Sequence, residues 1–475
     1  MTNTSRKKPT ILQSLRDREL MTTIFTLAWP TVTEQALQTI VQYADTAQVG
    51  RIGYSASAAV GLSSTTLWLV RSPLWALAMG VLACVSQALG AKDTGRVKRV
   101  TSQSVLLTLI SGTLLTVLTL AVAPFLPGWL GAEEAIRPAA GTYFAIVCAP
   151  TLFVASSIIF AAVLRATGDS KTPMRINILM NVINVLLNFL LINRPWTLRI
   201  GTLAIPVWGA GWGVTGAAIA TAAAYVVGGT LMFLAALQSP ELGLRGAKLQ
   251  VDPPIMRRCL AISGPITAQR VFNELGHVVF TGLITHNLST LAIATHTIAM
   301  TAEQAFYVPG FGMQAAAATL AGYSIGAKDE EKLGQYSEAI MAIAVFLMGT
   351  MSVFLFLFPR MFMGLFTPDQ EVILLGADVL RIVAVSEPFF AVLIILEGVF
   401  NGVGDTKAPF VINMCTMWGV RIVFTYLCVV VFQLGLTAVW WCMVADNMGR
   451  FLAMLIRYRG RSWKRELYMD QELIG

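Results

Sequence analysis

Long apolar stretches alternate with short polar ones along most of the chain. Twelve of these stretches are long enough to form helices that cross a membrane, which takes about 20 residues each. They lie at 21–49, 55–89, 101–127, 139–165, 174–193, 209–237, 257–285, 290–324, 334–365, 372–402, 408–433 and 435–456. The pattern therefore predicts an all-α integral membrane protein with twelve transmembrane helices.

Two short motifs occur twice at one constant interval. "GAKD" at 90–93 returns at 326–329, and "GDSKTP" at 168–173 returns as "GDTKAP" at 404–409. The intervals between their aspartates are equal, since 329 − 93 = 236 and 405 − 169 = 236. A fixed period is the signature of an internal repeat. We therefore expect two six-helix lobes that form a parallel repeat about a pseudo-two-fold axis, a design found in secondary transporters with a substrate site near the membrane midplane.

The repeat sets the expected domain organisation. A cytoplasmic tail at 1–20 precedes an N-lobe at 21–237, a cytoplasmic linker at 238–256 follows, and a C-lobe at 257–456 leads to a second cytoplasmic tail at 457–475. The repeated motifs themselves are expected to be structural. Glycines of "GAKD" can end a helix, and aspartates of "GD-[ST]-K-x-P" can cap the next one.

Composition and charge agree with a membrane protein. The chain is 56% hydrophobic and only 13% charged, whereas soluble domains carry roughly 25% charged residues. Most of its 34 Lys and Arg fall in the segments predicted to be cytoplasmic. The outer loops hold only Arg51, Arg137, Arg194, Arg199 and Arg360. Because basic residues mark the cytoplasmic side, we expect a cell inner membrane protein with both termini in the cytoplasm, and the net charge of +8 requires no nucleic-acid partner.

Several kinds of chemistry have no basis in the sequence. No G-x-x-x-x-G-K-[ST] stretch is present, so ATP hydrolysis is not expected and transport would depend on an ion gradient. The six cysteines and three histidines are scattered, without the spacing of a metal or redox site. A membrane-embedded enzyme would need a close catalytic cluster, and none is found. We expect neither an enzyme nor a bound cofactor.

Charged residues inside apolar stretches are the candidates for function, because a charge in a membrane helix costs about 2.5–3.5 kcal/mol on insertion scales. The acidic ones are Glu34, Asp45, Glu274, Glu303, Glu387, Glu397 and Asp446. Of these, Glu34, Glu303 and Asp446 are expected to serve structural pairing. Glu274 stands four residues after Arg270, so an ion pair on one helix face is an alternative to a functional role.

Several stretches resemble the MATE (multidrug and toxic compound extrusion) family of transporters. They are "WPTVTEQALQTIVQYADTAQVGRIG", "GVLACVSQALGAKD", "VLRATGDSKTPM", "GVTGAAIAT", "ATHTIAM", "VPGFGMQAAAATLAGYSIGAKD" and "FNGVGDTKAP", spread over nearly the whole chain. The resemblance implies an antiporter that exchanges H⁺ or Na⁺ for cationic, amphipathic drugs. It also implies that the two lobes rock about a central cleft to give alternating access.

The resemblance also implies ion-coupling residues in the N-lobe. One branch of the family uses an Asp fifteen residues after the Pro of the first helix, and Pro30 and Asp45 keep that spacing, since 45 − 30 = 15. Its partners form an N-x-x-x-D pattern in the fifth helix. Asn184 matches the first position, but Asn188 stands where the acid would be. Thr221 matches the polar residue of the sixth helix.

Another branch couples through the C-lobe, with a Glu 22 residues before a His. Glu274 and His296 keep that interval, since 296 − 274 = 22. Its second acid, in the tenth helix, falls on Phe390 here, and neither Glu387 nor Glu397 of the same helix is in register. The chain thus holds one carboxylate from each pattern, and Na⁺, if it is the coupling ion, is expected at Asp45 or Glu274.

An alternative of the same superfamily is a flippase for a lipid-linked saccharide. Its cavity would be strongly basic in order to hold a pyrophosphate, whereas the charges in the apolar stretches here have mixed signs. This favours the exporter. We expect a monomer in the lipid bilayer whose partners are small cationic molecules, with H⁺ or Na⁺ as the coupling ion.

Overall fold

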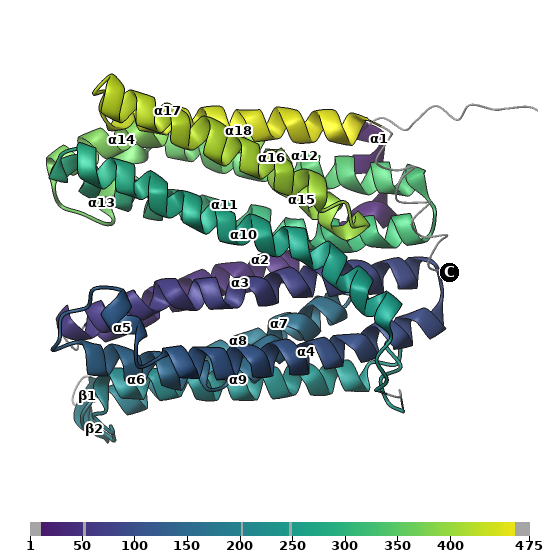
Figure 1. Cartoon of the computed structure of the whole chain (residues 1–475), viewed down its shortest axis with the longest axis horizontal. Helices are drawn as coiled ribbons and strands as arrows, with labels where there is room; N and C mark the ends of the chain where they lie inside the picture. The colour runs from purple at the N-terminus through teal and green to yellow at the C-terminus, as the bar shows by residue number, and fades with distance from the viewer. Residues whose placement is uncertain (1–10, 51–53, 201–202, 247–248, 461–475) are drawn as a thin grey trace, which may run out of the picture. The chain divides into compact units, whose positions relative to one another are not determined.

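The computed structural model describes residues 11–50, 54–200, 203–246 and 249–460, which are almost entirely helical (Figure 1). The first part of the chain forms α1 (Ile11–Arg16), α2 (Arg18–Gly50), α3 (Tyr54–Gly90), α4 (Thr94–Val122), α5 (Leu126–Trp129), α6 (Arg137–Cys148), α7 (Thr151–Ala166), α8 (Lys171–Ile192), the strands β1 (Trp196–Ile200) and β2 (Leu203–Val207), and α9 (Gly213–Gln238). The second part forms α10 (Pro253–Asn287), α11 (Thr290–Gly326), α12 (Glu330–Leu357), α13 (Pro359–Gly364), α14 (Gln370–Ala384), α15 (Glu387–Val403), α16 (Lys407–Thr416), the π-helix η1 (Met417–Ile422), α17 (Val423–Tyr426), the π-helix η2 (Leu427–Val431) and α18 (Leu436–Arg459).

Every predicted apolar stretch is largely helical, with ends moved by a few residues and with short breaks inside some stretches. The largest shift is at α4, which begins at Thr94 instead of 101, because its first turns are polar and an apolar run does not mark them. By length and hydropathy, six helices of the described chain could cross a membrane, and two bent helix pairs raise that number to eight. The protein is therefore a multi-pass helical protein by this criterion, and the count of twelve spans stays a prediction.

The two bent pairs occur at equivalent positions of the repeat. α6 and α7 meet at 47°, and α14 and α15 meet at 54°. The breaks correspond residue for residue, since 384 − 148 = 236 and 387 − 151 = 236. Pro150 lies in the first break and Pro388 at the start of α15, where the missing N–H and the fixed ring favour a break in the helix.

The repeated motifs have the same backbone in both copies. The chain turns through the left-handed region at Lys92 (φ 56°) and again at Lys328 (φ 55°). The glycines of the second motif match as well, with φ of 91° at Gly168 and 93° at Gly404. Helices α3 and α11 end at the glycine of each "GAKD", as predicted, but the left-handed residue is the lysine two positions later. The repeat predicted from the sequence is therefore present in the local structure.

The two "GAKD" copies also pack against one another. A Cβ on Gly90 would overlap the backbone carbonyl of Tyr323, and a Cβ on Gly326 would overlap the backbone carbonyl of Gln87. These contacts are reciprocal, because each carbonyl lies three residues before the glycine of its own copy. The side chain of Gln87 adds hydrogen bonds of 3.0 Å to the carbonyl oxygens of Gly402 and Val403. Only glycine fits this close approach of two backbones.

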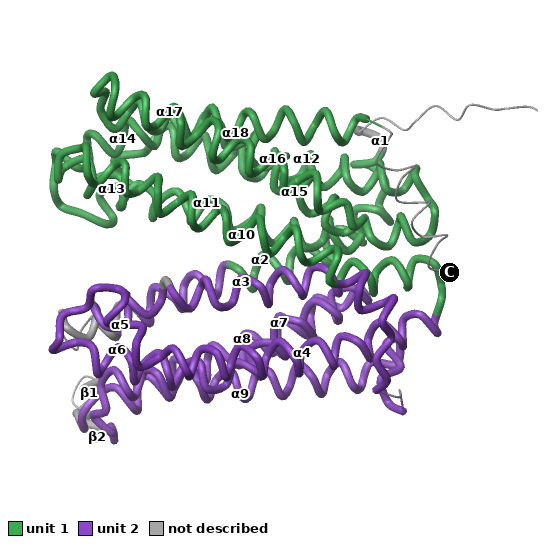
Figure 2. The backbone as a smooth tube through the Cα atoms, viewed as in Figure 1, with its two compact units in different colours: residues 1–35, 82–93, 260–475 green, residues 36–81, 94–259 purple. Residues whose placement is uncertain are grey.

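The chain divides into two compact units (Figure 2). Unit 1 comprises Met1–Gln35, Leu82–Asp93 and Leu260–Gly475, and unit 2 comprises Ala36–Val81 and Thr94–Cys259. In unit 2, α9 packs against α6, α7 and α8. In unit 1, α15 packs against α11, α12 and α18, and the side chains of α15 supply much of a buried apolar core. Helices α2 and α3 each contribute to both units, and the predicted lobe boundary at 238–256 stays a prediction.

One hairpin was not predicted. Strands β1 and β2 pair antiparallel, with Trp196 opposite Val207 and Ile200 opposite Leu203. The sequence predicts an outer loop here, because five-residue strands are too short to stand out beside long apolar helices. The two residues between the strands lie outside the described part of the chain.

Candidate functional site

Four predicted site residues come together in unit 2. Asp45 lies on α2, Asn184 and Asn188 lie one turn apart on α8, and Thr221 lies on α9. The Asn188 side chain donates a hydrogen bond of 2.7 Å to Asp45 Oδ1. Asn184 Nδ2 lies 3.2 Å from Thr221 Oγ1. Asn188 Nδ2 lies 3.3 Å from Asn184 Oδ1.

The amide of Asn184 fits its surroundings better when its oxygen and nitrogen are exchanged. Its nitrogen then donates to both oxygens of Asp45, at 3.1 and 3.3 Å, and its oxygen accepts from Thr221 Oγ1 at 3.2 Å. In this arrangement two amides of α8 hold the carboxylate of Asp45, and the hydroxyl of Thr221 holds one of those amides. The four residues then form one connected hydrogen-bond cluster.

This cluster is shielded but contains no basic side chain. Asn184 and Asn188 are 6% and 2% exposed, and Asp45 is half-buried. Within the described residues, no Lys, Arg or His nitrogen lies within ion-pair distance of Asp45. The side-chain oxygen of Asn188 is buried and has no hydrogen-bond partner. The charge of Asp45 is therefore held by neutral donors alone, with an unused acceptor beside it.

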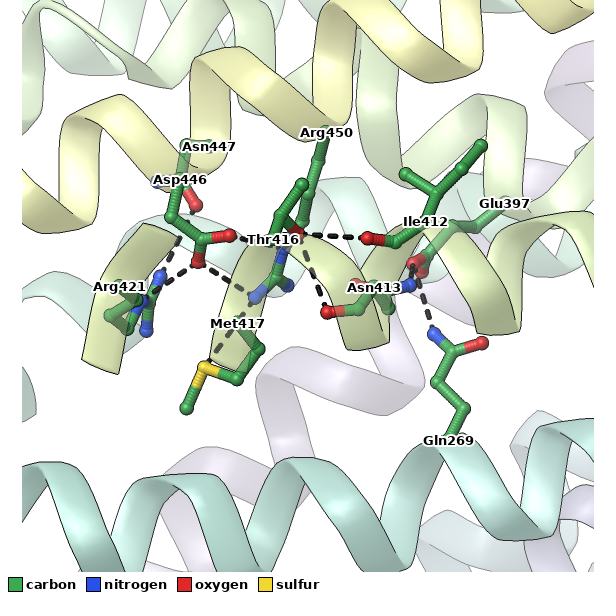
Figure 3. A network of polar contacts seen from close by, with 10 residues as sticks. All are labelled: Gln269, Glu397, Ile412, Asn413, Thr416, Met417, Arg421, Asp446, Asn447 and Arg450. Atoms are coloured by element: carbon green, nitrogen blue, oxygen red, sulfur yellow. Dashed lines mark hydrogen bonds and ion pairs between the residues drawn. The ribbon is translucent and has the colours of Figure 1, made fainter. Parts of the chain in front are cut away.

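Glu397, on α15 of unit 1, is surrounded in a similar way. Its Oε1 accepts hydrogen bonds from Asn413 Nδ2 at 2.8 Å and from Gln269 Nε2 at 3.2 Å, and Figure 3 shows both side chains pointing at the carboxylate. Its Oε2 accepts from Gln314 Nε2 at 3.4 Å. Three helices, α10, α11 and α16, thus each supply one amide to this carboxylate.

Asp446, on α18, has the opposite surroundings. It is fully buried and lies between two arginines (Figure 3). Arg450 binds both of its oxygens, at 2.9 and 2.7 Å, and Arg421 Nε lies 2.8 Å from Oδ2. Arg450 Nε also donates to Thr416 Oγ1 at 3.0 Å. A structural pairing role was expected for Asp446, and these ion pairs agree with it.

A π-helical turn places Thr416, which binds Arg450, and Arg421, which pairs with Asp446, on one face. Thr416 and Arg421 stand five residues apart across η1, and the i→i+5 pattern of a π-helix aligns such residues. In a regular α-helix, positions 416 and 421 would point about 140° apart. The local widening of this helix therefore lets both side chains reach α18.

Glu303 and Glu387 are two further buried carboxylates of unit 1. Each is only 1% exposed. The hydroxyl of Tyr307 donates to Glu303 Oε1, and the Tyr307 ring lies 4.7 Å from the ring of Phe390 on α15. Neither oxygen of Glu387 has a hydrogen-bond partner among the described residues. Glu387 is a predicted site residue, whereas Glu303 is predicted to serve structural pairing. The described residues contain no ion pair to Glu303.

Glu274 and His296, which share the spacing of the C-lobe pattern, make no hydrogen bond or ion pair with one another in the described part of the chain. Glu274 is exposed on α10, and the described part of the chain shows no ion pair between it and Arg270. His296 is buried with its ring edge-on to Phe280 and Trp440, at 5.6 and 5.8 Å. The ion-pair alternative for Glu274 therefore has no support in this structure.

The residues that sequence reasoning missed are amides. Gln269, Gln314 and Asn413 carry no charge and match no position of the family patterns, so the sequence does not single them out. One signal was available for Asn413, since 413 − 177 = 236 and both repeats keep an Asn at this position. Tyr307 had no comparable signal.

Comparison with known proteins identifies the fold. A family model described as MatE matches the chain twice, over residues 30–190 and 265–427. The chain is 26% identical over 456 residues to a protein of Thermotoga maritima named as a probable multidrug resistance protein NorM, covering 96% of each chain. The double match agrees with the internal repeat.

Solved structures of the same fold are similar over nearly their whole length. A MOP superfamily transporter from Pyrococcus furiosus, described as having a binding pocket of reverse polarity that suggests a different function, superposes with a TM-score of 0.83 at 23% identity, covering 97% of this chain and 99% of that one. A multidrug resistance MATE family transporter in an outward-facing conformation gives a TM-score of 0.82 at 23% identity, covering 98% and 99%.

Proposed function

The chain belongs to the MatE family, and from this premise we propose that it exports cationic amphipathic compounds in exchange for H⁺ or Na⁺. The observation that carries the proposal is the cluster around Asp45, an acidic group in a helix interior whose polar contacts among the described residues are amides. Such a group can change its charge state without breaking an ion pair. That is the property a coupling carboxylate needs.

The amides around Asp45 support both of its states. When Asp45 is ionised, Asn188 Nδ2 donates to it, as observed at 2.7 Å. When Asp45 carries a proton, it becomes a donor and needs an acceptor. The buried, unpartnered oxygen of Asn188 supplies one after a half-turn of the amide. Amide rotation would thus let one side chain stabilise the carboxylate before and after it binds the ion.

Coupling then follows from competition. A drug cation and the coupling ion both favour the negative carboxylate, so binding of one promotes release of the other. Alternating access by rocking of the two lobes would expose the site first to one side of the membrane and then to the other. We propose the inner membrane as its location, with cytoplasmic termini, a monomer as the transporting unit and no bound cofactor.

The flippase alternative is not favoured. The T. maritima relative is named as a multidrug resistance protein, and the buried charges of unit 1 include both signs, as at Asp446 and its two arginines. A strongly basic cavity, which a pyrophosphate would require, is not supported by this mixture.

An efflux assay tests the proposal. The protein is expressed in a host that lacks its own drug pumps, and loss of preloaded ethidium is followed by fluorescence with and without a protonophore. We expect energy-dependent efflux that collapses when the proton gradient, or the Na⁺ gradient in a parallel series, is removed. A well-expressed protein that moves no cationic dye under any gradient would contradict the proposal.

A further inference from the structure

Two cysteines meet where the last two helical segments of unit 1 join. Cys428 lies in η2, and Cys442 lies near the start of α18. Their Sγ atoms lie 3.8 Å apart, at the distance of a hydrogen bond between two thiols, in which either can donate. The sequence predicts no redox site among its cysteines, because these two are fourteen residues apart. The fold therefore creates a pair of thiols that the spacing does not reveal.

The turn between the two cysteines holds them opposite one another. The backbone N–H of Leu434 donates to the carbonyl oxygen of Cys428 at 2.7 Å, and that of Phe432 donates to the carbonyl oxygen of Leu427 at 2.9 Å. Gln433 has a φ of 51°, in the left-handed region, so the chain reverses direction within a few residues. Segments α17 and η2 then pack along α18. The contact between the sulfurs is thus set by a tight, hydrogen-bonded turn.

The ion pair of Asp446 lies deeper along the same contact. Asp446 follows Cys442 by four residues on α18, so their side chains share one face of the helix. Arg421, which lies 2.8 Å from Asp446, precedes Cys428 by about two helical turns. Because Asp446 is compensated by buried charge, this contact between α18 and the segments η1, α17 and η2 is a fixed one. The thiols lie at its end.

The thiol pair is close to the end of α18 that carries no basic residue. Arg457 and Arg459 lie in the last turn of α18, and basic residues mark the cytoplasmic side. Cys442 lies about 9 Å along the axis from Leu436, at a rise of 1.5 Å per residue. With the orientation proposed above, both thiols are near the outer side of the membrane, where disulfides form and persist. Cys428 is half-buried, so it is the more accessible thiol of the two.

We propose that Cys428 and Cys442 are a redox-modification site, which closes to an intramolecular disulfide by exchange with a disulfide donor, RSSR. The Cys428 sulfur attacks one sulfur of the donor, forms a mixed disulfide and releases one RSH. The Cys442 sulfur then attacks Cys428, forms the new S–S bond and releases the second RSH. The two cysteine protons end on the two released thiols, and the cysteines lose the two electrons that the donor gains. The inference goes beyond the proposed export function, because closure needs no transport.

The geometry allows this closure with small movements. The sulfurs must approach from 3.8 Å to a bond length of about 2.05 Å. Rotation of the two side chains can supply this, since they already point at one another across the contact. The bond would fasten the outer end of a contact that the Asp446 ion pairs hold further in. We therefore expect it to stabilise the fold, because a disulfide restricts the unfolded chain.

Reaction of the purified, detergent-solubilised protein with dithiodipyridine tests the pair. A single accessible thiol releases one pyridinethione, which absorbance counts, and keeps a pyridylthio group. A pair that closes releases two and keeps none. We expect mass spectrometry of peptides to find Cys428 joined to Cys442, with the mass of two hydrogen atoms lost. Cys415, exposed on α16 with no sulfur partner in the described part of the chain, is the internal control and should keep its pyridylthio group.

A variant separates closure from simple thiol reactivity. In Cys442→Ser, the remaining Cys428 should release one pyridinethione fewer than the original pair and keep a pyridylthio group. The oxidised original protein should unfold at a higher temperature than the reduced one. This rise should be absent in Cys442→Ser and retained in Cys415→Ser, the matched control.

The proposal fails if both Cys428 and Cys442 carry pyridylthio groups in the folded protein, because the thiols then react without meeting. It also fails if both stay unmodified until the protein is denatured, since the pair would be out of reach of any donor. A rise of the unfolding midpoint that persists in Cys442→Ser would contradict the assigned bond. Because closure is detected on the purified protein, a failed efflux assay leaves this result independent.

Discussion

Asp45 and Asp446 are the same residue type in two helix interiors, and their surroundings differ completely. Asp446 on α18 is bound by Arg450 through both oxygens and by Arg421 at 2.8 Å. Asp45 on α2 is held by the amides of α8, the shortest contact being 2.7 Å from Asn188. One carboxylate is permanently compensated by charge, and the other is supported by dipoles alone.

The difference separates a structural acid from an exchangeable one. Protonation of Asp446 would leave the charges of two buried arginines uncompensated. The carboxylate therefore cannot lose its negative charge without a large cost in free energy. The amides around Asp45 can donate or accept, so they tolerate either state. The acidic residue alone does not reveal the role. Its partners do.

The largest effect on folding is expected for Asp446→Asn. This change leaves Arg421 and Arg450 buried without a counter-charge, and breaking a buried pair by removing one partner costs about 3–5 kcal/mol. We expect little monodisperse protein and a strongly lowered unfolding midpoint in detergent. Asp378→Asn, which alters an exposed pair with Arg381, is the control. A normal midpoint for Asp446→Asn would remove the contrast with Asp45.

A smaller loss of stability is expected for Arg450→Met. Asp446 then keeps Arg421, so the pair remains balanced, but two hydrogen bonds to the carboxylate and one to Thr416 are lost. Hydrogen bonds to charged groups contribute about 1.5–3 kcal/mol each at most, and the unbranched side chain of Met, although shorter than that of Arg, refills part of the space. We expect a loss of about 1–3 kcal/mol, measured by denaturant titration. A cost equal to that of Asp446→Asn would show that the two arginines are not redundant.

Asn188→Leu tests the amide contact to Asp45 instead of the ion pairs of Asp446. It removes the shortest contact to Asp45, and loss of a hydrogen bond to a charged group corresponds to a change of about 10-fold or more. We expect ethidium efflux to fall by at least about 10-fold at equal expression, with a loss of stability no larger than that of Arg450→Met. Unchanged efflux would mean that Asn188 does not support the coupling state of Asp45.

The smallest change in stability is expected for Asp45→Asn, together with complete loss of coupled efflux. Asn has nearly the shape of a protonated Asp and can keep the hydrogen bond from Asn188, so the unfolding midpoint should stay within about 0.5 kcal/mol of the original, as for a neutral substitution. It cannot alternate between two charge states. Full efflux activity between about pH 6 and pH 8 in this variant would show that Asp45 is structural.

The sequence predicted the helices and the doubling well, because both depend on patterns that are local or strictly periodic. All predicted apolar stretches are largely helical, and the "GAKD" and "GD" junctions have matching backbone angles at Lys92 and Lys328 and at Gly168 and Gly404. The spacing of Pro30 and Asp45, read through the family resemblance, also led to a cluster whose members do meet, with Asn188 donating to Asp45.

The pairing of polar residues in unit 1 could not be predicted. Which face of a helix meets which neighbour depends on its rotation, and hydropathy carries little information on rotation when a helix is apolar all round. The π-helical turn at η1 changes that rotation partway along a span, so the alignment of Thr416 with Arg421 has no counterpart in a regular helical pattern. The amides around Glu397 come from three helices that are distant in sequence, and only the fold brings them together.

The reciprocal contact of Gly90 and Gly326 has a consequence for how a doubled chain can diverge. Each glycine faces a backbone carbonyl of the other copy, and a backbone atom cannot be replaced by mutation. A larger residue on one side therefore has no compensating change on the other, unlike a contact between two side chains. The two copies of the repeat differ at the positions of Asp45 and Glu397, where the contacts are made by side chains alone. At this joint neither glycine can be replaced by a larger residue, so both copies keep it.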